Sequence, residues 1–150
     1  MKHTFFFLFT LMMILLISCD AKNEMQEPKN MVDSFFLSYE KDGCTEALNN
    51  IFLTNSWLLE YSKDEIENLK NSLYSHINLI GKYCGYEIIS ERSIGNNLKH
   101  YSCMVKYERQ PLRFSFVFYK ANSSWVLYNF KYDDNLIEEL EESAKFYYFD

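Results

Sequence analysis

The sequence has few of the residues from which catalytic loops are built. Its 150 residues include four glycines and two prolines, and the glycines are not clustered. A phosphate-binding loop, a nucleophile elbow and a calcium loop all need glycine at fixed positions, because only glycine lets the backbone turn sharply there. The histidine pair of a zinc-protease helix is absent as well. The sequence therefore contains no motif that would by itself indicate an enzyme.

Basic residues are also scarce. There are 15 Lys and Arg against 21 Asp and Glu, which gives a formal net charge of −6. Binding to a phosphate backbone needs clustered Lys and Arg, and the sequence has no such cluster. We therefore expect no nucleic-acid partner, and the acidic balance also argues against electrostatic attraction to anionic lipid.

The chain lacks an apolar run of membrane-spanning length at its start. Met1-Lys2-His3 precedes a thirteen-residue apolar stretch from Phe5 to Ile17, and the sequence turns polar at Asp20. A spanning helix needs roughly 20 apolar residues. A short basic start followed by a short apolar run is typical of a signal peptide that directs export.

The residues at the end of this run, Leu16-Ile17-Ser18-Cys19, resemble the lipobox of bacterial lipoproteins. The resemblance implies that residues 1–18 are removed and that the Cys19 thiol carries a diacylglycerol. Such acyl chains hold a protein stably on a membrane, at ~0.8 kcal/mol per buried methylene. An ordinary secretory signal with a chance cysteine is the alternative. Both interpretations place the domain outside the cytoplasm, in the cell envelope if Cys19 is the anchor.

Cysteine is too rare for a disulfide framework. If Cys19 carries lipid, the three that remain are Cys44, Cys84 and Cys103, so one bridge at most can form within the chain. Their spacing matches no paired metal-binding motif, and we expect neither a metal nor a cofactor. The favoured interpretation is three small buried apolar side chains. If a bridge forms, the pair Cys84 and Cys103 is the most plausible, because both fall in the predicted sheet.

The chain after Cys19 reads as a tether and one domain. Residues 19–30 are polar with one proline and no periodicity, which predicts a flexible tether. From Met31 to Lys41 apolar residues recur at helical spacing, and we expect the domain to cover residues 31–150. Without residues 1–18 the formal charge is near −7.

Two further helices are predicted before the sheet. Thr45 can cap a short helix with apolar residues from Ala47 to Phe52. Ser62 and Glu65 have the spacing of a capping box, followed by a long apolar stripe that ends at Gly81. The intervening residues 54–60 form either a turn or one more helical turn.

After Gly85 the apolar spacing changes from 3.6 to 2, which predicts four strands joined by short turns. The expected strands are Tyr86–Arg92, Leu98–Glu108, Leu112–Tyr119 and Trp125–Tyr132. In the last strand Val126, Tyr128, Phe130 and Tyr132 are expected on one face. A short acidic helix follows Asp133-Asp134-Asn135. Consecutive strands with short turns form an antiparallel meander, so the fold class is α+β.

Helices followed by a curved four-stranded antiparallel sheet, over about residues 31–143, resemble the NTF2-like (cystatin-like) cone fold. The resemblance implies that the long helix fills the concave side of the sheet. It carries little information on function, since this fold hosts enzymes, ligand carriers and interaction modules.

Three kinds of function remain open. A buried His76 on the long helix, beside a sheet carboxylate, could act as a base, but a hydrogen-bonded structural histidine is the more common case. Sheet aromatics such as Tyr101 and Phe116, closed by Trp57 or by the long helix, could line a pocket for a small apolar ligand, or could simply form the core. An outer face carrying Arg113, Tyr119 and Trp125 could meet another envelope protein.

Few acids stand at inward positions, which disfavours the enzyme. Glu87, Glu91 and Glu108 lie near strand ends or among polar residues. We therefore expect a non-enzymatic, membrane-anchored envelope lipoprotein that binds a protein or a small apolar molecule. A small enzyme using His76, or a hydrophobic-ligand carrier, is the alternative.

Overall fold

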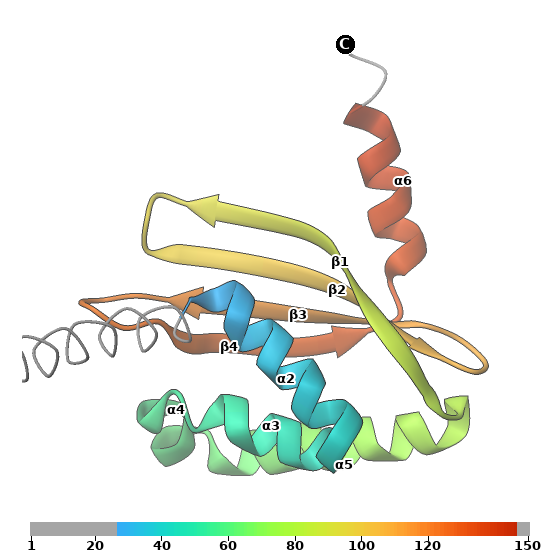
Figure 1. The fold of residues 1–150 in the computed structure, drawn as a ribbon, viewed down its shortest axis with the longest axis horizontal. Coiled ribbons are helices and arrows are strands. Elements are labelled where there is room, and N and C mark those ends of the chain that lie inside the picture. The colour runs from blue at the N-terminus through green and yellow to red at the C-terminus, as the bar shows by residue number, and fades with distance from the viewer. Residues whose placement is uncertain (1–26, 147–150) are drawn as a thin grey trace, which may run out of the picture.

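Helices precede strands in the fold, as the change in apolar spacing predicts (Figure 1). The computed structural model describes residues 27–146. The first half contains α2 (Pro28–Asp42), α3 (Cys44–Phe52), α4 (Ser56–Tyr61) and α5 (Lys63–Ile80). The second half contains β1 (Tyr83–Ile94), β2 (Leu98–Tyr107), β3 (Leu112–Tyr119), β4 (Val126–Asp133) and α6 (Leu136–Phe146). The predicted α+β class is confirmed for these residues.

The first helix begins earlier than predicted. It starts at Pro28 rather than at Met31, with Glu27 as the residue before the first turn. Proline suits this position because its fixed φ is already helical and because the first turn has no partner for the amide that proline lacks. Pro28 is also buried, so it belongs to the folded domain and not to the predicted tether.

Two predicted helix caps are absent. Gly43, at φ 93°, precedes α3, which places Thr45 inside the helix. Ser62 precedes α5 as predicted, but its side chain makes no capping hydrogen bond. For residues 54–60 the sequence allowed either a turn or one more helical turn, and the structure shows the short helix α4. Its cap is Asn55, whose side chain accepts a hydrogen bond from the Leu58 amide at 3.4 Å.

The four strands form one antiparallel sheet in the order β1-β2-β3-β4, which confirms the predicted meander. Cys103 pairs with Ile88 on one side and with Phe114 on the other. The first strand is longer than predicted, and its register with β2 shifts twice, between Tyr83 and Tyr86 and between Ile88 and Ser90.

The prediction that side chains alternate along β4 is wrong. Val117 pairs with Asn129 and Phe118 with Leu127, so Tyr128 is an extra residue between two pairs. An extra residue of this kind shifts the alternation by one position. Leu127 and Phe130 are therefore both buried, whereas Tyr128 is exposed.

Aromatic rings from α2 cover one face of the sheet, called here the inner face. The Phe35 ring lies 5.1 Å from that of Phe116 and 6.3 Å from that of Phe114, measured between ring centroids. Phe36 stacks on Tyr86 at 3.8 Å. These rings occupy the place where the NTF2-like resemblance puts the long helix.

The long helix α5 lies beside α3 and α4 and packs near β4 rather than across the middle of the sheet (Figure 1). Its Ile66, Leu73 and Ile80 are buried, as the apolar stripe predicts. A hydrogen bond of 2.8 Å between the Ser72 and Tyr132 hydroxyls ties it to β4. The aromatic rings over the centre of the sheet come from α2 and not from α5, so the expectation that the long helix fills the concave side is not confirmed.

The three cysteines in the described residues are all free. Cys103 is buried in β2, Cys44 is half-buried and Cys84 is exposed on β1. Burial raises the pKa of Cys103 to about 12. The register places Ile88, not Cys84, beside Cys103, so the disulfide between Cys84 and Cys103 that the sequence allowed is not observed. The expectation of three buried thiols fails at Cys84.

Candidate functional site

The sheet face opposite α2, called here the outer face, carries a polar cluster beneath α6. Arg113 of β3 contacts Asp133 at the end of β4 through two parallel hydrogen bonds of 2.9 Å, from Nε and Nη2. Its Nη1 donates to Glu139 of α6 at 3.2 Å. The three side chains are 18–22% exposed, so solvent screens this ion-pair network less than a surface pair.

Glu139 is the link between α6 and the sheet. Besides Arg113 it accepts a hydrogen bond from Ser102 at 2.8 Å and another from Ser90 at 3.4 Å. The Asn135 amide donates to Asp133 Oδ1 at 3.0 Å just before α6 begins, which fixes where the helix leaves the sheet. These bonds hold α6 on three strands at once.

The charges of this cluster suit a structural role and not proton transfer. Hydrogen bonding to Asp133 is the main cause of the raised pKa of Arg113. Burial raises the pKa of Asp133, but hydrogen bonds from Arg113 and from the Asn135 amide outweigh it, so that the pKa is lowered. Burial lowers the pKa of the nearby His100. An ionised and fully hydrogen-bonded Asp133 is a weak base, so the cluster positions α6 and is poorly suited to acid–base chemistry.

A groove lies beside this cluster, between α6 and the β1–β2 edge of the sheet, and is called here the α6 groove. Its volume is about 410 Å³, and its walls are mostly apolar with Glu139 on one side. The apolar lining residues include Ile88, Ile89, Met104, Leu136, Ile137 and Leu140. Ile137 and Leu140 are 67% and 66% exposed. These exposures show that the apolar side of α6 is only partly covered, and in Figure 1 the helix extends away from the strands.

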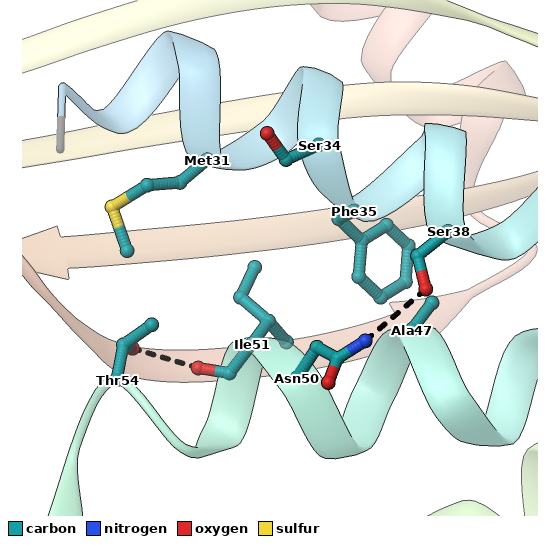
Figure 2. A pocket seen from close by; sticks show the side chains of 8 residues that line it. All are labelled: Met31, Ser34, Phe35, Ser38, Ala47, Asn50, Ile51 and Thr54. Carbon is teal, nitrogen blue, oxygen red and sulfur yellow. Dashed lines mark hydrogen bonds between the residues drawn. The ribbon is translucent and has the colours of Figure 1, made fainter. Parts of the chain in front are cut away.

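A second, smaller cavity of about 280 Å³ lies between α2 and α3, and Figure 2 shows its lining. Most of the polar groups there bond to one another or to the backbone: Asn50 donates to Ser38 at 3.3 Å, and Thr54 donates to the Ile51 carbonyl at 2.7 Å. The α6 groove is larger and its walls are more apolar, so it is the stronger candidate for binding an apolar ligand.

The structure places His76 at the edge of α5, half-buried. Its Nε2 lies 3.4 Å from Gln110 Nε2, and its ring lies 6.1 Å from that of Tyr132. Neither neighbour is a carboxylate. The arrangement that would make His76 a catalytic base does not appear among its contacts with the described residues.

Two of the three predicted ligand-binding residues lie together, because Tyr101 and Phe116 are cross-strand partners. The Trp57 ring lies instead beside that of Tyr61. Tyr101 and Phe116 are buried in the core under α2, with exposed fractions of 1% and 0%. Trp57 is exposed on α4. Aromatic residues of the inner face therefore form packed core, which is the alternative that the sequence left open.

The predicted interaction surface is wrong for two of its three residues. Trp125 is buried, with the ammonium groups of Lys120 and Lys99 at 4.7 Å and 5.8 Å from its ring centroid. Arg113 belongs to the ion-pair network beneath α6. Tyr119 alone is exposed, and its ring lies 6.2 Å from that of Tyr128.

The α6 groove is not predicted from the sequence because the alternating aromatic residues mark the opposite face of the strands. Two features pointed to the other face: small or charged residues at alternate positions of β2 and β3, namely Ser102, Arg113 and Ser115, and a final helix that combines Glu139 with Ile137 and Leu140. Cys19 lies outside the described residues, so the structure does not bear on the expected lipidation.

Within residues 27–146, no group of three or more His, Cys, Asp and Glu side chains is placed to hold a metal ion. Over the same residues, no helix combines the length and the apolar character needed to cross a membrane. Searches with this chain against protein-family models, curated proteins and solved structures find no match.

Proposed function

We propose that this chain is a non-enzymatic binding protein, anchored to an envelope membrane by lipid on Cys19 and using the α6 groove for an apolar ligand. The ligand is a small apolar molecule or an apolar side chain of an envelope protein. The groove carries the proposal: about 410 Å³ with apolar walls, beside exposed Ile137 and Leu140. Apolar concave surfaces with few polar groups are typical of binding sites.

The polar cluster supports binding over catalysis. Glu139 accepts three hydrogen bonds, and every guanidinium nitrogen of Arg113 already has a carboxylate partner. Because these side chains are already hydrogen-bonded, they hold α6 at a fixed position against the sheet, and this position keeps the groove open. Affinity then depends on apolar burial, at about 25 cal/mol per Å².

The fold we infer is a variant of the NTF2-like cone. Support comes from the element order, helices first and a four-strand antiparallel meander after, and from the register shifts in β1 and β4 that bend a sheet. In this variant α2 fills the concave side, so the ligand site lies on the outer face instead.

The anchor is tested by metabolic labelling with palmitate. We expect the wild-type chain to incorporate label and to sediment with membranes, because the lipobox directs acylation of the Cys19 thiol. Cys19→Ser should incorporate no label and should appear in the soluble envelope fraction. Cys84→Ser, which removes an exposed thiol within the domain, is the matched control and should be labelled like wild type. Labelling that survives Cys19→Ser would refute the anchor.

The groove is tested with the apolar fluorescent probe N-phenyl-1-naphthylamine. Ile137→Asp should weaken probe binding at least about tenfold, because burial of an isoleucine contributes roughly 1.5 kcal/mol or more and 1.4 kcal/mol is a factor of ten. Leu79→Asp is the matched control, since Leu79 is 69% exposed on α5 and does not line the groove. Equal binding by both variants and wild type would argue against the α6 groove.

A further inference from the structure

The short helix α4 exposes an aromatic pair. Trp57 and Tyr61 are four residues apart on one helical face, their ring centroids lie 5.3 Å apart, and they are 59% and 64% exposed. Leu53, just before α4, is 66% exposed. None of the residues of α4 is fully buried. These three side chains are called here the α4 patch.

The α4 patch lies at the end of the domain where α2, the first described helix, begins. Met31, in the first turn of α2, lines the same cavity as Thr54 (Figure 2). Thr54 and Asn55 are bonded to the Leu127 backbone at 3.1 Å and 2.8 Å, which fixes the start of α4 against β4. The beginning of α2 and the beginning of α4 are therefore neighbours.

The lipid on Cys19 would keep this end close to a bilayer. Eight residues separate Cys19 from Pro28. Whatever their conformation, eight residues span at most about 29 Å, at up to 3.6 Å per residue. A short connection also raises the effective concentration of the domain at the surface, so a weak contact there is enough to orient it.

We infer that the α4 patch docks on the lipid bilayer to which Cys19 tethers the chain. This inference rests on the lipid anchor proposed above. Trp and Tyr favour the boundary between lipid headgroups and acyl chains, where the ring is apolar and the N–H or O–H reaches water. Charges near the patch have both signs, with Glu60 on α4 and Lys63 at the start of α5. The docking therefore depends on apolar contact and is insensitive to salt.

The test uses the lipidated chain, purified and reconstituted into phosphatidylcholine vesicles. The chain has two tryptophans, and Trp125 is buried. In a Trp125→Phe variant, Trp57 is the single reporter. We expect vesicles with brominated acyl chains to quench most of the Trp57 emission, and aqueous acrylamide to quench little of it. If this variant does not fold, the difference between wild type and Trp57→Phe gives the same readout.

The matched control moves the reporter to the far end of α5. That helix has 18 residues and is therefore about 27 Å long. Leu79→Trp, in a chain that also carries Trp57→Phe and Trp125→Phe, should show the reverse pattern: quenched by acrylamide and spared by brominated lipid. High salt should leave both patterns unchanged.

Flotation of the vesicles separates the two proposals. A chain that floats while Trp57 is open to acrylamide and spared by brominated lipid keeps its anchor, and the docking of the α4 patch is then refuted. Trp57 shielded from both quenchers would mean that protein, such as a second copy, covers the patch, which also refutes docking on lipid. A chain that neither carries lipid nor floats would refute the anchor and the docking together.

Discussion

Replacing Phe116 by alanine is expected to lower the free energy of unfolding by about 3–5 kcal/mol, because a fully buried phenylalanine leaves a cavity when it is truncated. Its ring has no exposed surface and contacts the rings of Phe35 at 5.1 Å and Phe130 at 5.1 Å. Urea denaturation followed by circular dichroism measures the change. A chain lacking residues 1–26 serves for this experiment, since those residues lie outside the described fold.

The control for Phe116 is its neighbour Val117, which lies on the outer face of the same strand and is half-buried. Val117→Ala should cost about 1 kcal/mol, near the centre of the range for single substitutions. A similar small cost for Phe116→Ala would contradict the packed inner face and would revive the ligand pocket that the sequence left open.

Replacing Arg113 by leucine should lower the free energy of unfolding by about 2–4 kcal/mol. This loss of stability is larger than the stabilisation by an exposed ion pair and smaller than the loss on breaking a fully buried one. It is the range expected for side chains that are about one-fifth exposed. The substitution leaves Asp133 and Glu139 near one another without a cation. Hydrogen exchange of the α6 amides should increase as well, because Glu139 loses one of its three partners.

The cost of Arg113→Leu should depend on pH with a definite sign. In the wild type the pKa of Asp133 is lowered, so its stabilisation is present above the unfolded pKa of about 3.9 and is lost as the pH falls through the folded pKa. In the variant, the nearby Glu139 carboxylate repels the ionised Asp133, which raises the folded pKa of Asp133, so stability is lost as the pH rises. The difference in unfolding free energy should therefore be small near pH 3 and should grow up to about pH 6.

Lys106 supplies the matched control for Arg113. It pairs with Glu87 at 2.8 Å on the same outer face, but these side chains are 39% and 60% exposed. Lys106→Leu should change the free energy of unfolding by less than about 1 kcal/mol. If Arg113→Leu behaves like this control at every pH, the network beneath α6 contributes no more than a surface ion pair.

The order of the elements could be predicted from the sequence because it depends on local spacing. The stripe from Ile66 to Ile80 gave the long helix, and the alternation from Leu112 to Tyr119 gave β3 with its observed bounds. Both patterns arise because one face of the helix or strand is buried. Short turns between strands then leave few topologies other than a meander.

Contacts between elements that are far apart in the sequence could not be predicted from local spacing. The extra residue at Tyr128 comes from pairing with β3, and nothing in the local spacing of β4 reveals it. Which helix covers the sheet depends on competition between α2 and α5, which both carry apolar stripes. The α6 groove depends on Glu139 meeting Arg113, 26 residues away, so its existence follows from the fold and not from a motif.

The two register shifts of β1 have a consequence for how this protein behaves when crowded. β1 is an edge strand, so one side of its backbone is open to pairing with a strand of another molecule. The shifts twist that edge, and the exposed charges of Glu87, Glu91 and Arg92 stand along it. Both features oppose edge-to-edge pairing, so a chain held at high local density on a membrane would be protected from aggregation through its sheet.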